Sequence, residues 1–287
     1  MISRRLTLLF ALTVASATAM AKPDTLAFSA IPDQDQSQLN KRFSKVAGYL
    51  STKLGIKVKY IPVKSYAAAI TAFRNNQVQL AWFGGLSGVR ARALVPGSQA
   101  IAQGFEDTEF QTWFIAHHST GLKLSKDFPS GIKGKTFTFG SKGSTSGRLM
   151  PEYYIRENFG QAPKQAFKQV GFSGNHSRTI ALVQTGAYQV GATNYKVWQQ
   201  QVKSGQIDPS KVSVIWKTPT YPDYQWTVRG DVDAMWGAGF KAQIKKALLE
   251  MKDPELLKAF PRSRFISADN DDYQPIVDTA KEIGLLD

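Results

Sequence analysis

Apolar and polar residues alternate in three short segments near the start of the chain. Residues 25–31, 57–62 and 78–83 have the period of strands. Between them, residues 39–54 carry apolar side chains at helical spacing, and residues 65–74 form a second helical segment that a serine opens. This order of strand, helix, strand, helix and strand predicts a parallel sheet with helices on its faces.

The same pattern returns in the middle of the chain. A stretch at 110–116 separates the two regions, and we expect it to cross from one lobe to the other. The later predicted elements are strands at 136–139, 166–170, 190–193 and 212–216, and helices at 148–159, 177–185, 239–252 and 274–284.

The two regions predict an α/β protein of two lobes with a ligand cleft between them. We expect lobe I to comprise residues 22–112 and 222–287, and lobe II to comprise residues 113–221. Each lobe is expected to hold a mixed, mostly parallel sheet flanked by helices. Ligands of such proteins usually bind beyond the carboxyl ends of the strands, where the two lobes face each other.

The first 21 residues have the composition of a secretory signal peptide. Arg4 and Arg5 precede an apolar run from Leu6 to Val14, and the segment ends in Ala19-Met20-Ala21. A buried N-terminal helix is the alternative. No later stretch reaches about 20 uninterrupted apolar residues, the length of a membrane span. We therefore expect export to the periplasm and a mature chain that starts near residue 22.

Composition excludes several kinds of chemistry. The chain has no cysteine, which rules out disulfides, thiolate metal sites, iron–sulfur clusters and a cysteine nucleophile. Only three histidines are present, at 117, 118 and 176, so a histidine metal site is not expected. Neighbouring residues of a strand point to opposite faces, which disfavours chelation by His117 and His118.

The positive charge is concentrated in one part of the chain. The full chain has a formal net charge of +14, and residues 113–221 contain fourteen Lys and Arg against four acids, a net charge of +10. Nucleic-acid binding is one interpretation of such a surplus. Export and the lack of a motif that combines aromatic and basic residues favour another, which is attraction of a small anion.

A loop rich in small and hydroxyl residues follows the predicted strand at 136–139. It runs from Gly140 to Gly147, and Ser144, Thr145 and Ser146 stand just before the next helix. Hydroxyl groups and free N–H groups at a helix N-terminus can hold an anion. A plain helix cap would need only one of the three, so the sequence favours an anion cradle.

Other helix openings also follow strands. Tyr66 and His176 each lie at such a position, where the cleft would bring them near the cradle. Catalytic patterns are weaker, because nothing in the chain resembles the G-x-S-x-G turn of a serine hydrolase. We expect no cofactor and no metal ion.

At this level of detail the chain resembles the PhnD-type periplasmic substrate-binding proteins of phosphonate and phosphite ABC transporters, above all the phosphite-binding members. The segments that carry the resemblance are Ser65–Ala67, Leu80–Gly84, Ser144–Gly147, Met150–Tyr154, Asn175-His176, Val190–Asn194 and Val214–Pro219. The resemblance implies a two-lobed type II binding protein that acts as a monomer, binds no nucleic acid and delivers a small oxyanion to an inner-membrane permease.

The resemblance also implies the residues of the site. The expected donors and cleft-lining side chains are Ser144, Thr145, Ser146, His176, Tyr66, Trp82, Phe110 and Tyr224. The first four match the oxyanion donors of the family, and Tyr66 matches its cleft tyrosine. Phe110 falls where relatives often have another tyrosine, and the Trp82 side chain could equally belong to the core.

The chain departs from aminoethylphosphonate binders at two positions. Those relatives have a Glu and an Asp where this chain has Val197 and Tyr224, within a residue or so of alignment. Glu152 and Glu157 are expected to face solvent, although one of the acids at 106–109 could reach the cleft. An enclosed ammonium group needs a carboxylate partner, so phosphite is the expected ligand.

Several alternatives to phosphite stay open. Methylphosphonate, hypophosphite, phosphate and sulfate lack an ammonium group as well. A secreted phosphoester hydrolase is the alternative from another functional class.

Overall fold

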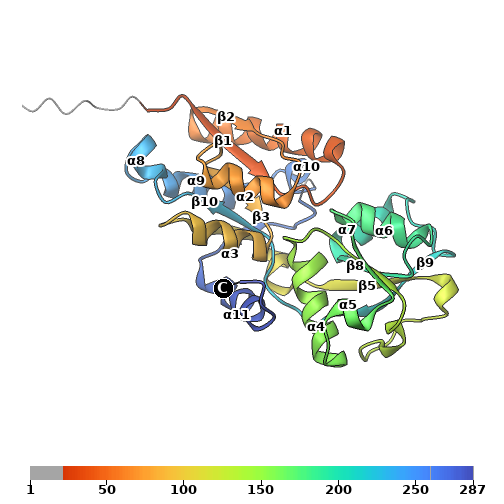
Figure 1. The fold of residues 1–287 in the computed structure, drawn as a ribbon. Coiled ribbons are helices and arrows are strands. Elements are labelled where there is room, and N and C mark those ends of the chain that lie inside the picture. Colours follow the sequence, from red (N-terminus) through yellow and green to blue (C-terminus); the bar gives the residue numbers. More distant parts are fainter. Residues whose placement is uncertain (1–21, 259, 287) are drawn as a thin grey trace, which may run out of the picture.

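The computed structural model describes residues 22–258 and 260–286, and shows two lobes, each with a sheet between helices (Figure 1). The predicted signal peptide lies outside the described residues. Below, lobe I and lobe II are the parts of the chain around the first and the second sheet.

Lobe I is built from the two ends of the described chain. Its sheet has the order β11-β4-β10-β3-β1-β2, and β1 is parallel to both β2 and β3. Its elements are β1 (Thr25–Ala30), α1 (Gln36–Leu54), β2 (Lys57–Tyr60), α2 (Tyr66–Arg74), β3 (Leu80–Phe83), α3 (Gly85–Leu94), β4 (Gln99–Gly104), β10 (Gln225–Val228), α8 (Val232–Trp236), α9 (Phe240–Leu249), α10 (Pro254–Leu257), β11 (Phe265–Ser267) and α11 (Gln274–Glu282).

Lobe II is built from the middle of the chain. Its sheet has the order β7-β6-β8-β5-β9, and β6 is parallel to both β7 and β8. Its elements are β5 (Thr112–His117), β6 (Thr136–Phe139), α4 (Met150–Phe159), α5 (Pro163–Ala166), β7 (Gln169–Phe172), α6 (His176–Gln184), β8 (Val190–Asn194), α7 (Tyr195–Lys203) and β9 (Val212–Lys217).

The chain crosses between the lobes twice, from β4 to β5 and from β9 to β10. The two crossings run beside each other, because Phe110 and Tyr221 exchange backbone hydrogen bonds of 2.9 and 3.0 Å. The strands next to the crossings pair in antiparallel fashion, whereas parallel strands form the core of each sheet away from them. The carboxyl ends of those parallel strands face the other lobe (Figure 1).

Sequence periodicity explains the best-predicted elements. In α1, the residues Leu39, Phe43, Val46 and Leu50 are buried at a spacing of three to four and form one face of the helix. The helix ends where Gly55 adopts a φ of 65°, a conformation that costs glycine little. The predicted strand–helix order of residues 25–83 is confirmed.

Two predicted elements of lobe II are wrong in detail. The stretch at 110–116 is not only a crossing, because Thr112–His117 is β5, a strand with a partner on each side. Phe114 and Ile115 are both fully buried, in cores on opposite faces of the sheet, so the strand lacks the alternation that marks a half-buried strand. The strand predicted at 166–170 begins later, since Pro163 starts a short helix that ends at Ala166.

A buried ion pair ties the last part of lobe I to the first crossing. Both Asp107 and Arg262 are buried, and the guanidinium donates to the carboxylate through Nε at 2.7 Å and Nη2 at 2.6 Å. The Gly104 N–H donates to the same carboxylate at 3.0 Å. The Arg262 guanidinium also lies over the rings of Phe110 and Tyr224. This pair therefore fixes the segment before β11 against the crossing.

We expect Asp107→Ala to destabilise the protein by about 3–5 kcal/mol, because it leaves the Arg262 charge buried without a partner. Urea denaturation measures this change. Glu255→Ala is the control, because it removes the partner of Lys258 in a solvent-exposed pair and should leave the unfolding midpoint close to that of the unaltered protein. Equal midpoints for the two variants would contradict the importance of the buried pair.

Candidate functional site

The hydroxyl-rich loop after β6 is closed by glycines at its two ends. The Gly140 N–H donates to the Gly147 carbonyl at 2.7 Å. A Cβ on Gly140 would lie 3.2 Å from the Cα of Gly147, so a larger residue would force the loop open. The loop therefore folds back on itself and starts the π-helical turn Thr145–Leu149 that leads into α4.

Ser144 caps this turn, and its neighbours supply free donors. The Ser144 Oγ accepts a hydrogen bond from the Gly147 N–H at 2.9 Å. The cap uses an oxygen lone pair and leaves the hydroxyl proton available. The N–H groups of Thr145 and Ser146 lie in the first turn, where a helix offers them no acceptor. All three residues are buried, and capping by Ser144 leaves room for these groups to act as donors as well.

Thr145 faces lobe I. Its Oγ1 accepts a hydrogen bond from the Leu86 N–H at the start of α3, at 3.0 Å. Its hydroxyl also interacts with the Asp223 carboxyl, which accepts from the Gly85 N–H at 2.8 Å. The Thr145 side chain therefore joins the two lobes at the edge of the cradle.

His176 is a neutral donor beside the cradle. It is fully buried at the start of α6, and burial lowers its pKa from 6.5 to about 3. The Asn194 N–H donates to its Nδ1 at 3.2 Å, which places the ring proton on Nε2. That Nε2 lies 3.4 Å from the Ser146 Oγ. The structure therefore brings together the predicted donors Ser146 and His176.

Tyr66 reaches the cradle from lobe I. The Ser65 Oγ caps α2 by accepting from the Ala68 N–H at 3.1 Å, which orients the first turn of that helix. The Tyr66 hydroxyl interacts with those of Ser144 and Tyr224. Burial raises its pKa well above 10.0, so the phenol keeps its proton and can donate.

Besides Tyr66, the three other predicted aromatic residues lie in successive layers. Tyr224 is next to the cradle side chains, and Phe110 packs against it with ring centroids 5.4 Å apart. Trp82 stacks behind Tyr224 at 5.5 Å and is enclosed by Trp226 and Phe260. Trp82 is therefore a residue of the lobe I core that supports Tyr224.

Two carboxyl groups that lie between the two lobes were not identified from the sequence. Asp223 and Asp33 are 1% and 7% exposed, and each lies beside a predicted site residue. Burial raises the pKa of Asp223 to about 7, and its Oδ2 has no hydrogen-bond partner among the described residues. Asp33 accepts from the Tyr224 hydroxyl at 3.0 Å. Tyr224 was expected to stand, within a residue of alignment, where aminoethylphosphonate binders have an Asp, and the adjacent Asp223 places a buried carboxyl group at that point of the chain.

Glu152 also differs from the expectation that it faces solvent. It is 1% exposed and pairs with Arg148 and with Arg156, whose Nη2 lies 2.7 Å from Oε1. Glu152 is one helical turn after Arg148, so its carboxylate faces the turn Thr145–Leu149 that follows the loop. It forms ion pairs with the two arginines and serves the structure of lobe II.

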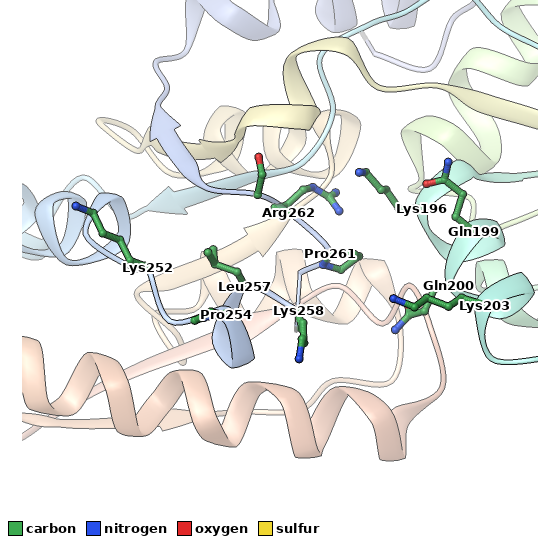
Figure 2. A pocket seen from close by; sticks show the side chains of 11 residues that line it. Lys196, Gln199, Gln200, Lys203, Lys252, Pro254, Leu257, Lys258, Pro261 and Arg262 are labelled. Atoms are coloured by element: carbon green, nitrogen blue, oxygen red, sulfur yellow. The ribbon is translucent and has the colours of Figure 1, made fainter.

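A cationic groove lies beside the site, between α7 and residues 252–263 (Figure 2). Its volume is about 700 Å³, and Lys196 and Arg262 point toward each other across it. Glu106 lies 3.9 Å from Lys196, and Asp107 is bound by Arg262. Two of the acids at 106–109 thus engage the cations of this groove.

The described residues contain no group of three or more His, Asp or Glu side chains that could hold a metal ion. Among the helices of the same residues, none has the length and apolar character needed to cross a membrane.

Comparison with known proteins identifies the family. Residues 28–273 match the model of the periplasmic substrate-binding proteins of phosphonate ABC transporters. The chain belongs to this family. It is a binding protein of a phosphonate and phosphite transport family, as the resemblance implied.

Individual relatives agree with this assignment. The chain is 39% identical over 280 residues, 95% of this chain and 94% of the relative, to the probable ABC transporter phosphite binding protein PhnD1 of Prochlorococcus marinus. The solved structure of that PhnD1 in complex with methylphosphonate matches with a TM-score of 0.87 at 40% identity, over 92% of this chain and 99% of the other. The phosphonates-binding periplasmic protein of Escherichia coli is 27% identical over 69% of this chain and 58% of its own length.

The solved structures also confirm the predicted fold class. A binding protein component of a phosphonate transporter from Pseudomonas aeruginosa has the same fold, with a TM-score of 0.79 at 22% identity over 90% of this chain and 85% of that chain. The predicted two-lobed α/β architecture is therefore correct.

Acid should destabilise the protein through His176. The folded protein keeps this ring neutral down to about pH 3, whereas the unfolded chain binds a proton below about pH 6.5. Stability linked to this residue is therefore present above pH 6.5 and is lost as the pH falls, by about 1.4 kcal/mol per pH unit.

We expect the free energy of unfolding of the unaltered protein to fall relative to that of His176→Gln between pH 6.5 and about pH 4. Urea titrations at several pH values measure the difference between the free energies of unfolding of the two proteins. The contributions of all other titrating groups cancel in this difference. A difference that does not change with pH would show that His176 is charged in the folded state.

Proposed function

We propose that the mature chain binds one phosphite ion between its lobes in the periplasm and presents it to an ABC permease in the inner membrane. The observation that carries this proposal is the convergence of buried, uncharged hydrogen-bond donors from both lobes. Ser144, Ser146 and His176 come from lobe II and Tyr66 comes from lobe I. The phosphite-binding name of the relative from Prochlorococcus marinus supports the same ligand.

The donors suit the three oxygens of a phosphite ion. Hydroxyl, imidazole and first-turn N–H groups all donate, and no lysine or arginine is needed among them. Tyr224 lies near the Tyr66 hydroxyl and packs against Phe110, and aromatic surface at this position would suit the P–H group because that group forms no conventional hydrogen bond. A further hydroxyl at that face, as in phosphate, would lack an acceptor.

Asp223 is the residue that forms a hydrogen bond with the protonated or deprotonated oxygen of the ligand. Its carboxyl is buried beside Thr145, and the free Oδ2 needs a partner. A P–OH group can donate to the ionised carboxylate, or the protonated carboxyl can donate to a P–O⁻ group. In either case one proton is shared between Asp223 and the ligand, and the carboxylate is not left buried and unpaired.

Contacts between the lobes favour a compact ligand. The Leu86 N–H bonds the Thr145 Oγ1 on one side of the cradle, and the His176 N–H bonds the Asp33 carbonyl at 3.0 Å on another. Phosphite, hypophosphite and methylphosphonate are the smaller candidates, and contacts this close on two sides of the cradle favour them. Aminoethylphosphonate is longer, and its ammonium group would have to displace the proton that Asp223 shares with the oxyanion, because Asp33 already accepts from Tyr224.

We expect phosphite to bind the mature protein with a stoichiometry of one and more tightly than aminoethylphosphonate. Titration calorimetry measures both, and a thermal-shift screen adds methylphosphonate, hypophosphite, phosphate and sulfate. A ligand at 100 times its dissociation constant stabilises the folded state by about 2.7 kcal/mol. Tighter binding of aminoethylphosphonate would defeat the choice of phosphite, and steady release of phosphate from an ester would favour the hydrolase alternative.

We expect Ser146→Ala to weaken phosphite binding about tenfold to a hundredfold. A hydrogen bond to a charged group contributes roughly 1.5–3 kcal/mol, and the substitution removes one donor. The control is Ser141→Ala in the same loop, whose hydroxyl accepts from the Gly143 N–H at 3.4 Å. Equal affinities for both variants would remove the Ser146 hydroxyl from the site.

A further inference from the structure

Asn194 stands at the junction of the two lobes, at the end of β8, and is 2% exposed. Its backbone N–H donates to Nδ1 of His176 at 3.2 Å. Because that bond occupies Nδ1, the ring proton of His176 is on Nε2, toward Ser146. The backbone of Asn194 therefore sets the donor direction of His176.

The Asn194 side chain caps the next helix. Its Oδ1 accepts from the N–H groups of Lys196 at 2.7 Å and Val197 at 3.1 Å, at the start of α7. These bonds define which end of the amide is oxygen, and the opposite end is therefore the NH₂ group. That Nδ2 donates to the Tyr224 hydroxyl oxygen at 2.9 Å.

The bond from Asn194 determines the direction of the next one. The Tyr224 hydroxyl accepts from Asn194, so its own proton is free to donate to the Asp33 Oδ2 at 3.0 Å. Asp33 follows β1 in lobe I, and its carbonyl accepts from the His176 N–H at 3.0 Å. His176, Asn194, Tyr224 and Asp33 thus form one closed ring of hydrogen bonds that joins lobe II to lobe I.

We infer that the Asn194 side chain is a positioning residue that stabilises the closed, ligand-holding arrangement of the lobes through Tyr224 and Asp33. This inference rests on the proposed binding of an oxyanion between the lobes. The bond from Asn194 to His176 lies within lobe II, whereas the bond from Asn194 to Tyr224 links lobe II to a residue that packs with lobe I. Opening the lobes breaks the bond from the Asn194 side chain to Tyr224 and leaves the bond from its backbone to His176. The side chain therefore stabilises the closed lobes, whereas the backbone orients the His176 ring.

Asn194→Ser separates the two roles. Serine is a good helix cap, so it keeps the start of α7 without adding charge, but it is too short to donate to Tyr224. The expected result is a rate of phosphite dissociation about tenfold faster, with a smaller change in the association rate. Stopped-flow competition measures both rates.

Asn175→Ser is the matched control. Asn175 caps α6 of the same lobe by accepting from the Arg178 N–H at 2.8 Å, and it takes no part in the ring. It should leave both rates within about twofold of those of the unaltered protein. Dissociation from Asn194→Ser that is no faster than from Asn175→Ser would overturn the inference.

Tyr224→Phe removes the middle of the ring and leaves the aromatic surface. If the two residues act through one bond, the double variant Asn194→Ser/Tyr224→Phe should dissociate little faster than the worse single variant. Effects that multiply independently would show that Asn194 does not act through Tyr224.

A direct measure of closure distinguishes this inference from the proposed function. Because the chain has no cysteine, spin labels can be placed at Lys45→Cys in lobe I and Lys168→Cys in lobe II alone. With whichever oxyanion the unaltered protein binds, Asn194→Ser should show a smaller population at the short, closed distance. Failure of the unaltered protein to bind phosphite would refute the choice of ligand, whereas identical closed populations in both proteins would refute the role of Asn194.

Discussion

The arrangement of this protein depends on keeping a histidine neutral and oriented between two lobes. Burial removes the charge of His176, and a single backbone N–H, that of Asn194, decides which ring nitrogen donates. A buried neutral donor stabilises an anion only when its direction is fixed in advance. The glycine-closed loop, the cap of the following turn and the loop after β1 all serve that condition, because each holds a group in contact with His176 or with Ser146.

The buried carboxyl groups of the described residues fall into two kinds, those that have a nearby cation and support the fold, and one that has no paired cation and is available to a ligand. Asp107 has Arg262, Glu152 has two arginines, and Asp33 faces Arg42 and accepts from Tyr224. Each of these acids has a nearby cation that reduces the cost of its desolvation, although burial still raises the pKa of Asp33 and of Asp107. Asp223 has no paired cation: it accepts from the Gly85 N–H, lies beside the Thr145 hydroxyl, and has an oxygen with no partner among the described residues. The Asp223 carboxyl is therefore the one among these acids that is best suited to form a hydrogen bond with a ligand.

Sequence patterns predicted the parts of the structure that rest on local physics. The amphipathic face of α1, the serine cap of α2 and the hydroxyl loop before α4 are all marked within a few residues of the chain. Strand β5 was missed because a strand covered on both faces lacks alternation. Asp33 was missed because its importance comes from long-range contacts, with Tyr224 191 positions away along the chain. Asp223 could have been found, because it lies within the alignment tolerance allowed around Tyr224.

The middle of the chain is strongly positive, and this charge attracts anions over a longer distance than the uncharged hydrogen-bond donors of the site. A groove of about 450 Å³ at the edge of lobe II contains the exposed Lys142 and Lys164 beside Arg148 and Arg156, which both pair with Glu152, and it shares Lys142 with a groove that touches the cradle loop. Exposed cations act over roughly a Debye length of about 8 Å and attract any anion. They give little selectivity, because Coulomb attraction does not distinguish phosphite from sulfate. Selectivity needs short, directed bonds in a dry site, where an unmatched proton or oxygen is costly. Placing the cations outside and neutral donors inside lets the protein gather anions with one set of residues and choose among them with another.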